Sequence, residues 1–265
     1  MILDEIAKKT IERIDEKKRE LPLAELGAQV RELSRHRDAS HPFPFQEALS
    51  GERLGFICEI KKASPSKGVI AEHFPYLEIA AEYESAGADA ISVLTEPFYF
   101  KGSDAYLSEI RGRVRLPIIR KDFTVDEYMI YEAKKMGADA VLLICAILSP
   151  AQLAEYRELA EELGLSALVE AHDERELETA LQSGARIVGV NNRNLKDFTV
   201  DIDNSVRLRS LAPPEVLFVS ESGMKTRADI ARLEEHGIDG VLIGETFMRS
   251  ADKAGMLREL RGGEN

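Results

Sequence analysis

From about residue 55 to the end of the chain, two kinds of segment alternate in their pattern of hydrophobic and polar positions. Short apolar runs are separated by longer stretches whose apolar residues recur at helical spacing. We expect eight strands, at 56–61, 90–94, 117–121, 140–145, 167–170, 187–191, 216–220 and 240–243. The expected helices span 77–85, 105–111, 125–135, 150–163, 174–182, 203–211, 227–235 and 253–260. Nearly continuous apolar strands in strict alternation with helices indicate a parallel sheet.

A glycine-centred phrase recurs through this region, as AGADAISVL, MGADAVLLI, SGARIVGV and HGIDGVLIG. The glycines concerned, Gly87, Gly137, Gly184 and Gly237, follow one another at intervals of 50, 47 and 53 residues. Each comes after a helical pattern and before an apolar run, which is the usual place of a helix C-terminal glycine. A period near 50 residues corresponds to two strand–helix units, so four periods make eight. We therefore predict an α/β fold, a single (β/α)8 TIM barrel over 51–265, with an open doubly wound sheet as the alternative.

Residues 1–50 lie outside the repeat. Their pattern is that of one or two amphipathic helices, with Ile6, Ile11 and Ile14 on one side, and HPFPF at 41–45 reads as a turn-rich linker. A segment of about 50 residues makes a marginal core by itself. We predict that it is an N-terminal helical extension packed on the barrel.

Composition narrows the class of protein. The chain has 265 residues, of which 44% are hydrophobic, and no apolar run approaches the roughly 18 residues of a membrane span. Its net charge of −12 argues against a nucleic-acid-binding surface, which needs a basic face. Cys58 and Cys145 lie in apolar runs, so we expect buried free thiols in a reducing cytoplasm. No cysteine or histidine spacing predicts a metal site.

Charged or amide side chains stand at the ends of several expected strands, where structure alone favours small or apolar residues. They are Glu59, Lys61, Lys121, Glu170, Asn191 and Glu221, the last followed by Ser222. The C-terminal strand ends form the active-site face of a barrel. Ionised groups there are costly unless paired, so we expect the lysines and glutamates to neutralise one another. Because side chains alternate across a strand, Glu59 and Lys61 should both face the barrel interior.

Two glycine-containing loops follow the seventh and eighth expected strands. One holds Ser222 and Gly223, and the other holds Gly244 and Glu245. Loops at these two positions form the recurrent phosphate site of the barrel fold, and glycine lets backbone N–H groups approach phosphate oxygens. The lysine-rich segment KKASPSK at 61–67 adds local positive charge to an acidic protein. These features predict a small phosphorylated substrate.

Seven motifs lie at or just after expected strands. They are EIKKASPS at 59–66, SVLTEPFYFKGS at 92–103, PIIRKDF at 117–123, LVEAH at 168–172, GVNNRNL at 189–195, ESG at 221–223 and LIGETFMR at 242–249. In this order they closely resemble the signatures of the indole-3-glycerol phosphate synthase family, and the N-terminal extension is similar to the family's as well. Ala146 is a mild departure, since relatives can carry lysine there.

The resemblance implies a lyase of tryptophan biosynthesis. The family's substrate is 1-(2-carboxyphenylamino)-1-deoxyribulose 5-phosphate, and the enzyme closes the pyrrole ring with release of carbon dioxide and water to give indole-3-glycerol phosphate. Electrons released by decarboxylation enter the iminium that ring closure forms. No metal and no organic cofactor is therefore expected.

The resemblance also assigns roles to individual residues. Lys121 resembles the acid that protonates the ketone oxygen, with a pKa lowered by burial or by Lys61, which would hold the substrate carboxylate. Glu170 resembles the general base of dehydration, and the second acid is either Lys61 or Lys121. Glu59 would orient the lysines.

Further positions match the family's substrate contacts. Asn191 and Glu221 would bind substrate hydroxyls or support the acid–base pair, and Ser64 and Arg193 would touch the substrate. Phosphate would be held by Ser222, Gly223, Gly244 and the backbone of Glu245. The apolar pocket for the aromatic ring would comprise Leu94, Phe100, Phe123, Leu142 and Leu195.

Two other functions compete with this interpretation. One is another phosphate-binding barrel enzyme of tryptophan or histidine biosynthesis, which would use a different acid–base pair. The other is a catalytically inactive barrel that acts as a binding partner, although no catalytic group is missing here. Nothing in the sequence identifies a surface for association with other tryptophan-pathway enzymes, and we expect neither a nucleic-acid nor a membrane partner.

Overall fold

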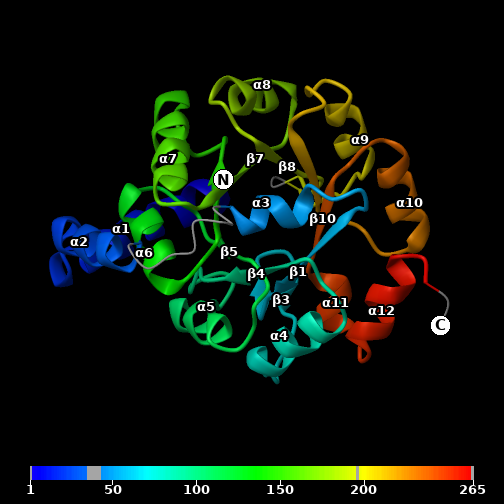
Figure 1. Ribbon diagram of the computed structural model, residues 1–265, viewed down its shortest axis with the longest axis horizontal. Helices are drawn as coiled ribbons and strands as arrows, with labels where there is room; N and C mark the ends of the chain where they lie inside the picture. Colours follow the sequence, from blue (N-terminus) through cyan, green and yellow to red (C-terminus); the bar gives the residue numbers. More distant parts are fainter. Residues whose placement is uncertain (1, 35–42, 195–196, 264–265) are drawn as a thin grey trace.

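The computed structural model describes residues 2–34, 43–194 and 197–263, and these form a closed barrel of eight parallel strands (Figure 1). In barrel order the strands are β1 (Gly55–Ile60), β4 (Ala90–Leu94), β5 (Ile118–Lys121), β6 (Ala140–Ile144), β7 (Ser166–Ala171), β8 (Ile187–Asn191), β9 (Leu217–Glu221) and β10 (Gly240–Ile243). The register of β1 on β10, with Gly55 opposite Gly240, closes the ring. This pairing confirms the barrel and rules out the open sheet.

Helices follow the barrel strands and form the outer ring visible in Figure 1. They are α4 (Tyr76–Ser85), α5 (Asp104–Arg111), α6 (Glu127–Met136), α7 (Pro150–Glu162), α8 (Glu174–Gln182), α9 (Asp203–Arg209), α10 (Arg227–Glu235) and α12 (Lys253–Leu260). Local chemistry sets their ends. Asp126 caps α6 by accepting the N–H of Tyr128, so this helix begins two residues later than the pattern suggested, and Gly137 ends it with φ of 87°.

Three short elements were not predicted. A hairpin of β2 (Ala63–Ser64) and β3 (Gly68–Val69) follows β1, and a single turn of helix, α11 (Glu245–Arg249), lies between β10 and α12. Two-residue strands and five-residue helices contain too few positions for any period to show in the sequence.

A helix closes the barrel at the end where the strands begin, in a segment that we expected to form a linker. Pro44 and Phe45 begin α3 (Pro44–Leu49), which lies across the centre of the ring in Figure 1; residues 41 and 42 lie outside the described part. Phe45 and Leu49 are buried with the interior side chains of the strands. Gly55 and Gly240 make room for them, since a Cβ at either position would lie 2.8 or 2.9 Å from Leu49 Cδ2. The linker prediction was wrong because proline, common in turns, is equally suited to the first turn of a helix.

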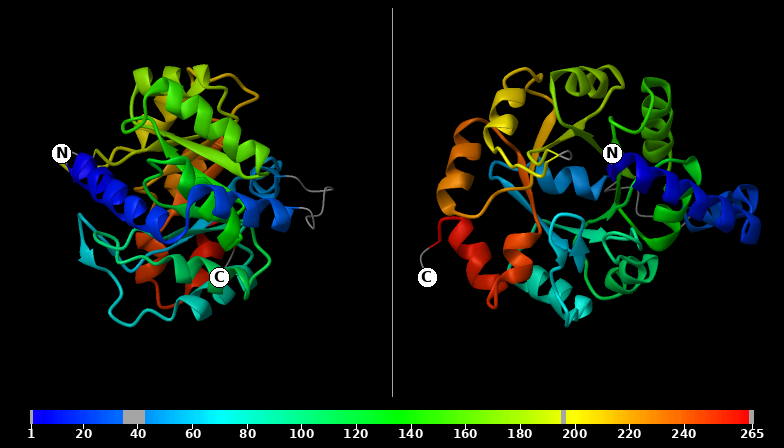
Figure 2. Two further views of the ribbon diagram at one scale, coloured as in Figure 1. Left: turned by 90° about the vertical axis from the view of Figure 1, so that its left-hand side faces the viewer. Right: turned by 180° about the vertical axis from the view of Figure 1, so that it is seen from behind.

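The N-terminal extension is helical, as expected, and consists of α1 (Ile2–Glu20) and α2 (Leu23–Ser34). Figure 2 shows α1 lying across the barrel, with its first residues over the mouth. Ile6 and Ile14 are buried, but Ile11 is 49% exposed. Its placement with them was wrong, because five residues from Ile6 is about 140° around a helix. No helix in the described ranges is both long and apolar enough to cross a membrane.

Candidate active site

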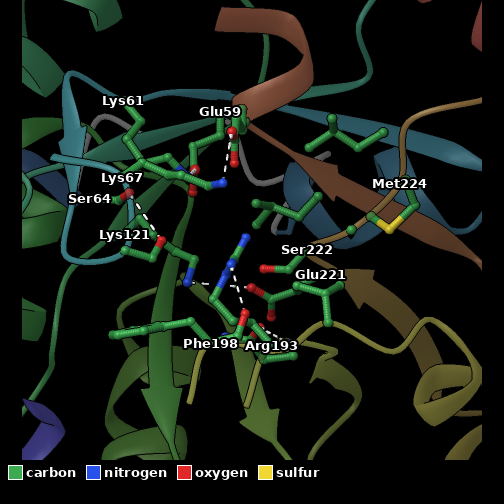
Figure 3. A pocket seen from close by; sticks show the side chains of 18 of the residues that line it. Glu59, Lys61, Ser64, Lys67, Lys121, Arg193, Phe198, Glu221, Ser222 and Met224 are labelled. Carbon is green, nitrogen blue, oxygen red and sulfur yellow. Dashed lines mark hydrogen bonds and ion pairs between the residues drawn. The ribbon is translucent and has the colours of Figure 1, made fainter. Parts of the chain in front are cut away.

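A cavity of about 780 Å³ opens at the C-terminal ends of the barrel strands. Its walls include Glu59, Lys61, Ser64, Leu94, Phe100, Lys121, Phe123, Leu142, Glu170, Asn191, Arg193, Glu221, Ser222, Gly223, Gly244 and Glu245. The structure therefore brings together all the residues that the sequence predicted for the site except Leu195, which lies outside the described residues. Figure 3 shows the side chains of Lys61, Lys121, Glu221 and Arg193 directed toward one shared space.

Lys121, the last residue of β5, lies at the centre of the charged groups. Its Nζ is 3.3 Å from Glu170 Oε2, at the end of β7, and 3.4 Å from Glu221 Oε2, at the end of β9. Burial opposes a charge on Lys121, but the carboxylates of Glu221, Glu170 and Glu59 outweigh it and raise the pKa of Lys121 above its usual value. The expected lowering was wrong because the nearest charges are negative, and Lys61 is paired elsewhere. Lys121 is thus held as the protonated acid.

The two carboxylates that contact Lys121 differ in their affinity for protons. Burial opposes charge on Glu170, but Lys121, His172 and a hydrogen bond from Asn191 lower its pKa. Burial raises the pKa of Glu221 to about 7, and Lys121 only partly offsets this effect. Near neutral pH, Glu170 is therefore an ionised base, while Glu221 is close to its titration point. Carboxyl groups with separated pKa values are typical of acid–base sites.

Glycine makes room for Glu221 on the neighbouring strand. A Cβ on Gly189 of β8 would lie 2.2 Å from Glu221 Oε1. Gly189 must therefore be glycine because it faces the buried Glu221 carboxylate, although nothing in the sequence marks this position.

Glu59 and Lys61 form an ion pair at the end of β1, which confirms that both side chains face the barrel interior. Gly244, after β10, accommodates the pair, because a Cβ there would lie 2.3 Å from Glu59 Oε1 and 3.0 Å from Lys61 Nζ. The Lys61 ammonium consequently lies at the edge of the loop that begins with Gly244. Lys67, from the turn between β2 and β3, reaches the same loop through Glu245 at 3.8 Å.

The loop after β9 has an unusual backbone. Ser222 has φ of 68° and Gly223 has φ of 103°, so two consecutive residues are left-handed. A left-handed serine is uncommon, and such strain is concentrated at functional sites. Asn192 supports the turn by donating from Nδ2 to Ser222 O at 3.0 Å and to Ser220 Oγ at 2.9 Å. Ser222 and Gly223 line the same cavity as Gly244.

An apolar wall faces the charged groups. The rings of Phe100 and Phe123 lie 5.9 Å apart, and Leu94 and Leu142 line the same cavity. Buried Glu96 holds the Phe100 loop in place by accepting the backbone N–H groups of residues 98, 99 and 100 at 2.7–2.9 Å. A flat aromatic group fits such a wall.

The sequence did not reveal the part of α1 that completes this wall. Ile2, Leu3 and Ile6 line the cavity. The helix is held in place by Arg13, which donates to both oxygens of Asp122 at 3.0 and 2.9 Å, next to Lys121. An amphipathic pattern shows that a face is buried but carries no signal of what it packs against.

Potential metal ligands and cysteines also occur outside the charged cluster. Among the described residues no group of three or more potential ligands is placed to hold a metal ion. Cys58 and Cys145 are both buried free thiols, as the sequence predicted.

Comparison with known proteins gives one consistent match. Residues 3–260 match the family model described as indole-3-glycerol phosphate synthase. The protein of that name from Ruminiclostridium cellulolyticum is 55% identical over 262 residues, which cover 99% of each chain. The one from Leuconostoc mesenteroides is 51% identical over 264 residues, again 99% of each chain.

Solved structures resemble the fold at low identity. A 3-hexulose-6-phosphate synthase from Salmonella typhimurium superposes with a TM-score of 0.65 at 14% identity, covering 79% of this chain and 97% of its own. A mutant tryptophan synthase alpha-subunit from Pyrococcus furiosus gives 0.60 at 16% identity, covering 78% and 98%. At this identity the likeness shows the barrel fold alone.

Proposed function

The chain belongs to the indole-3-glycerol phosphate synthase family of carboxy-lyases, which act in tryptophan biosynthesis, and from this premise we propose how its residues carry out the reaction. The proposed substrate is 1-(2-carboxyphenylamino)-1-deoxyribulose 5-phosphate. It has three recognisable parts, a phosphate, a hydroxylated chain with a ketone, and an aromatic carboxylate. The cavity offers groups suited to the phosphate, the reacting chain and the aromatic ring, and Lys61 is the cation assigned to the carboxylate.

The phosphate is assigned to the loops after β9 and β10. The left-handed turn at Ser222 and Gly223 and the start of α11 at Gly244 and Glu245 direct backbone N–H groups at one place. Lys61 supplies positive charge at that edge, and the Glu245 carboxylate is turned to Arg249 and Lys67, at 3.1 and 3.8 Å. Glu245 therefore contributes through its backbone, as a carboxylate facing phosphate would repel it.

Ring closure is assigned to Lys121. The aromatic carbon attacks the ketone carbon, and the ketone oxygen takes a proton from Lys121 Nζ. The surrounding carboxylates keep Lys121 protonated before ring closure, because they stabilise its ammonium form and not the neutral amine. The transfer is favoured when substrate enters between Lys121 and these carboxylates. Loss of carbon dioxide then returns electrons to the iminium.

Dehydration is assigned to Glu170 as base. It accepts the proton from carbon while the hydroxyl group leaves as water. Glu170 Oε2 lies 3.3 Å from Lys121 Nζ, so the proton that it gains can pass to the neutral lysine amine. Lys61 or Lys121 protonates the leaving hydroxyl group, and the lysine that gives this proton regains one from solvent, which balances the proton consumed when the carboxylate leaves as carbon dioxide. Asn191 orients Glu170 by a hydrogen bond, and Arg193 faces the same space from the loop after β8.

The aromatic ring is assigned to the wall of Leu94, Phe100, Phe123 and Leu142, with Leu3 of α1 opposite. Stacked and edge contacts with the two phenylalanine rings would hold it near Lys121. Ser64, beside the cavity mouth, and Glu59, paired with Lys61, complete the contacts.

One observation carries the proposal most directly, namely a protonated lysine between an ionised carboxylate and one with a pKa near 7. The test is turnover of the substrate by purified protein without added metal or cofactor, followed by indole fluorescence. The chain contains no tryptophan, so the background is low. Glu170→Gln should lower kcat by about 10²–10⁴-fold. Glu178→Gln, on the exposed side of α8, is the matched control and should retain full activity.

Absence of turnover by folded wild-type protein would reject the proposed reaction. Turnover by wild type that is undiminished in Glu170→Gln would keep the reaction but reject the assignment of the base.

A further inference from the structure

A histidine stands directly behind the proposed base. His172 follows the last residue of β7, and its side chain is 18% exposed. One oxygen of Glu176, Oε2, lies 3.0 Å from the ring Nδ1 and accepts the backbone N–H of the same histidine at 2.9 Å. The histidine carbonyl oxygen accepts a hydrogen bond from Asn204 Nδ2 at 3.0 Å. These contacts from α8 and α9 fix the orientation of the imidazole ring.

The other ring nitrogen faces Glu170. Nε2 of His172 lies 3.5 Å from Glu170 Oε1, whereas Lys121 contacts Glu170 Oε2. Nε2 is buried and has no hydrogen-bond partner within the described ranges of the chain. The two oxygens of the base therefore have separate nitrogen neighbours. Lys121 is the one that loses its charge during ring closure, so a second cation is needed to keep Glu170 ionised.

We propose that His172 is a positioning residue for Glu170: clamped by Glu176, its imidazolium holds Glu170 Oε1 and keeps this carboxylate ionised while Lys121 is neutral. This inference rests on the proposed function, because it assigns His172 a part in the step that Glu170 catalyses. A carboxylate that has lost its neighbouring cation in a buried site would otherwise take up a proton and cease to be a base.

The surroundings of His172 favour its charged form. Glu170 faces it from β7, Glu176 from α8 and Glu221 from β9. Burial lowers the pKa of His172, but Glu176 and Glu170 outweigh burial and raise it above the ordinary value. Cys145, after β6, is neutral, since burial raises its pKa to about 12. The imidazolium thus persists toward neutral pH and is lost as the pH rises through the raised pKa.

His172→Asn is the sharpest variant. Its amide nitrogen takes the place of Nδ1 and retains a donor for Glu176, but nothing replaces Nε2. A nearby cation lowers a carboxyl pKa by about 1–3 pH units, so removing it should move the acid limb of kcat, which reports the enzyme–substrate complex, up by about 1 pH unit. His172→Gln, whose amide reaches the place of Nε2 without charge, should shift the limb in the same direction by less. His236→Asn, an exposed histidine at the end of α10, is the matched control.

A second readout does not depend on turnover. Long-range ¹H–¹⁵N NMR of the five histidines, assigned by loss of one signal in His172→Asn, gives the pKa and tautomer of His172. Glu170→Gln should lower the His172 pKa by the same coupling of about 1 unit, since the interaction is reciprocal. The His236 signal should stay in place.

The outcomes are distinct. A shifted acid limb together with a lowered His172 pKa supports the proposal. An acid limb that does not move in His172→Asn, or a His172 pKa that Glu170→Gln leaves unchanged, overturns it while wild-type turnover still stands. Loss of kcat in His172→Asn with an unmoved limb would show a merely structural role. If wild type itself does not turn over substrate, the proposed function falls first, whatever the NMR coupling shows.

Discussion

Replacing Lys121 by methionine would test the charged cluster, because it keeps the length of the side chain and removes the ammonium group. At 3.3 and 3.4 Å, and with an effective dielectric constant of about 20, each lysine–carboxylate attraction is on the order of 5 kcal/mol. The full loss is not realised, since burial opposes the lysine charge and His172 remains beside Glu170. Loss of a neighbouring cation raises a carboxyl pKa by about 1–3 pH units, which for Glu170 corresponds to about 1–4 kcal/mol of stability at pH 7.

The sign of the pH dependence follows from the pKa of Glu170. In wild type Lys121 and His172 lower this pKa, so Glu170 stabilises the fold above its unfolded pKa of about 4.3, and the contribution is lost as the pH falls through the lowered pKa. We expect Lys121→Met to lower the free energy of unfolding by about 3 kcal/mol at pH 7 and by less at pH 3. Because Lys121 is the proposed acid, kcat should fall by about 10²–10⁴-fold.

Urea denaturation followed by far-ultraviolet circular dichroism at pH 3 and pH 7 measures the first effect, and indole fluorescence measures the second. Lys135→Met, at an exposed position on α6, is the matched control and should match wild type in both assays. A variant at Lys121 as stable as wild type at pH 7, or a loss equal at both pH values, would refute the electrostatic reasoning. Full turnover in that variant would refute the assignment of the acid.

Three further predictions follow from the geometry. Burial raises the pKa of Glu221 to about 7, so between pH 4.5 and 7 this group binds more protons in the folded than in the unfolded state, and wild-type stability should fall as the pH rises. Glu221→Gln should flatten this slope in urea denaturation, and an unchanged slope would contradict the raised pKa. Gly244→Ala would place a Cβ 2.3 Å from Glu59 Oε1 and should lower kcat/KM by about 10²-fold, while circular dichroism should show an intact fold. Full activity of this variant would contradict the close approach. Arg13→Ala removes the bidentate partner of buried Asp122 and should lower the free energy of unfolding by about 3 kcal/mol in the same urea assay. A loss of less than about 1 kcal/mol would show that the ion pair is dispensable.

Strand positions were predictable because the information is local. A buried parallel strand must be apolar on both faces, so β4 at Ala90–Leu94 and β8 at Ile187–Asn191 match the expected ranges without error. Glycine at the end of each helix added a second local signal, and Gly137 is left-handed as that signal requires. The prediction of a closed barrel came from counting eight strand–helix units along the chain.

The charged residues of the site were predictable for a similar reason. Parallel strands all end at the same edge, so polar residues at strand ends converge even when the sequence separates them widely. Lys121, Glu170 and Glu221 were found this way, and Lys121 Nζ lies 3.3 Å from Glu170 Oε2 and 3.4 Å from Glu221 Oε2. The direction of the Lys121 pKa was not predictable, because it depends on distances to three carboxylates that the order of residues does not contain.

The sequence by itself determined which residues are apolar, which segments are strands or helices, and which polar groups stand at the strand ends, since each of these depends on neighbours along the chain. The tertiary structure decided that α3 closes the barrel, that α1 forms a wall of the cavity, and that His172 lies behind Glu170. Those are contacts between segments far apart in sequence or between side chains of fixed orientation. They depend on how closure of the ring places each surface in space, and a periodic pattern of hydrophobic residues shows that a face is buried without identifying the surface that covers it.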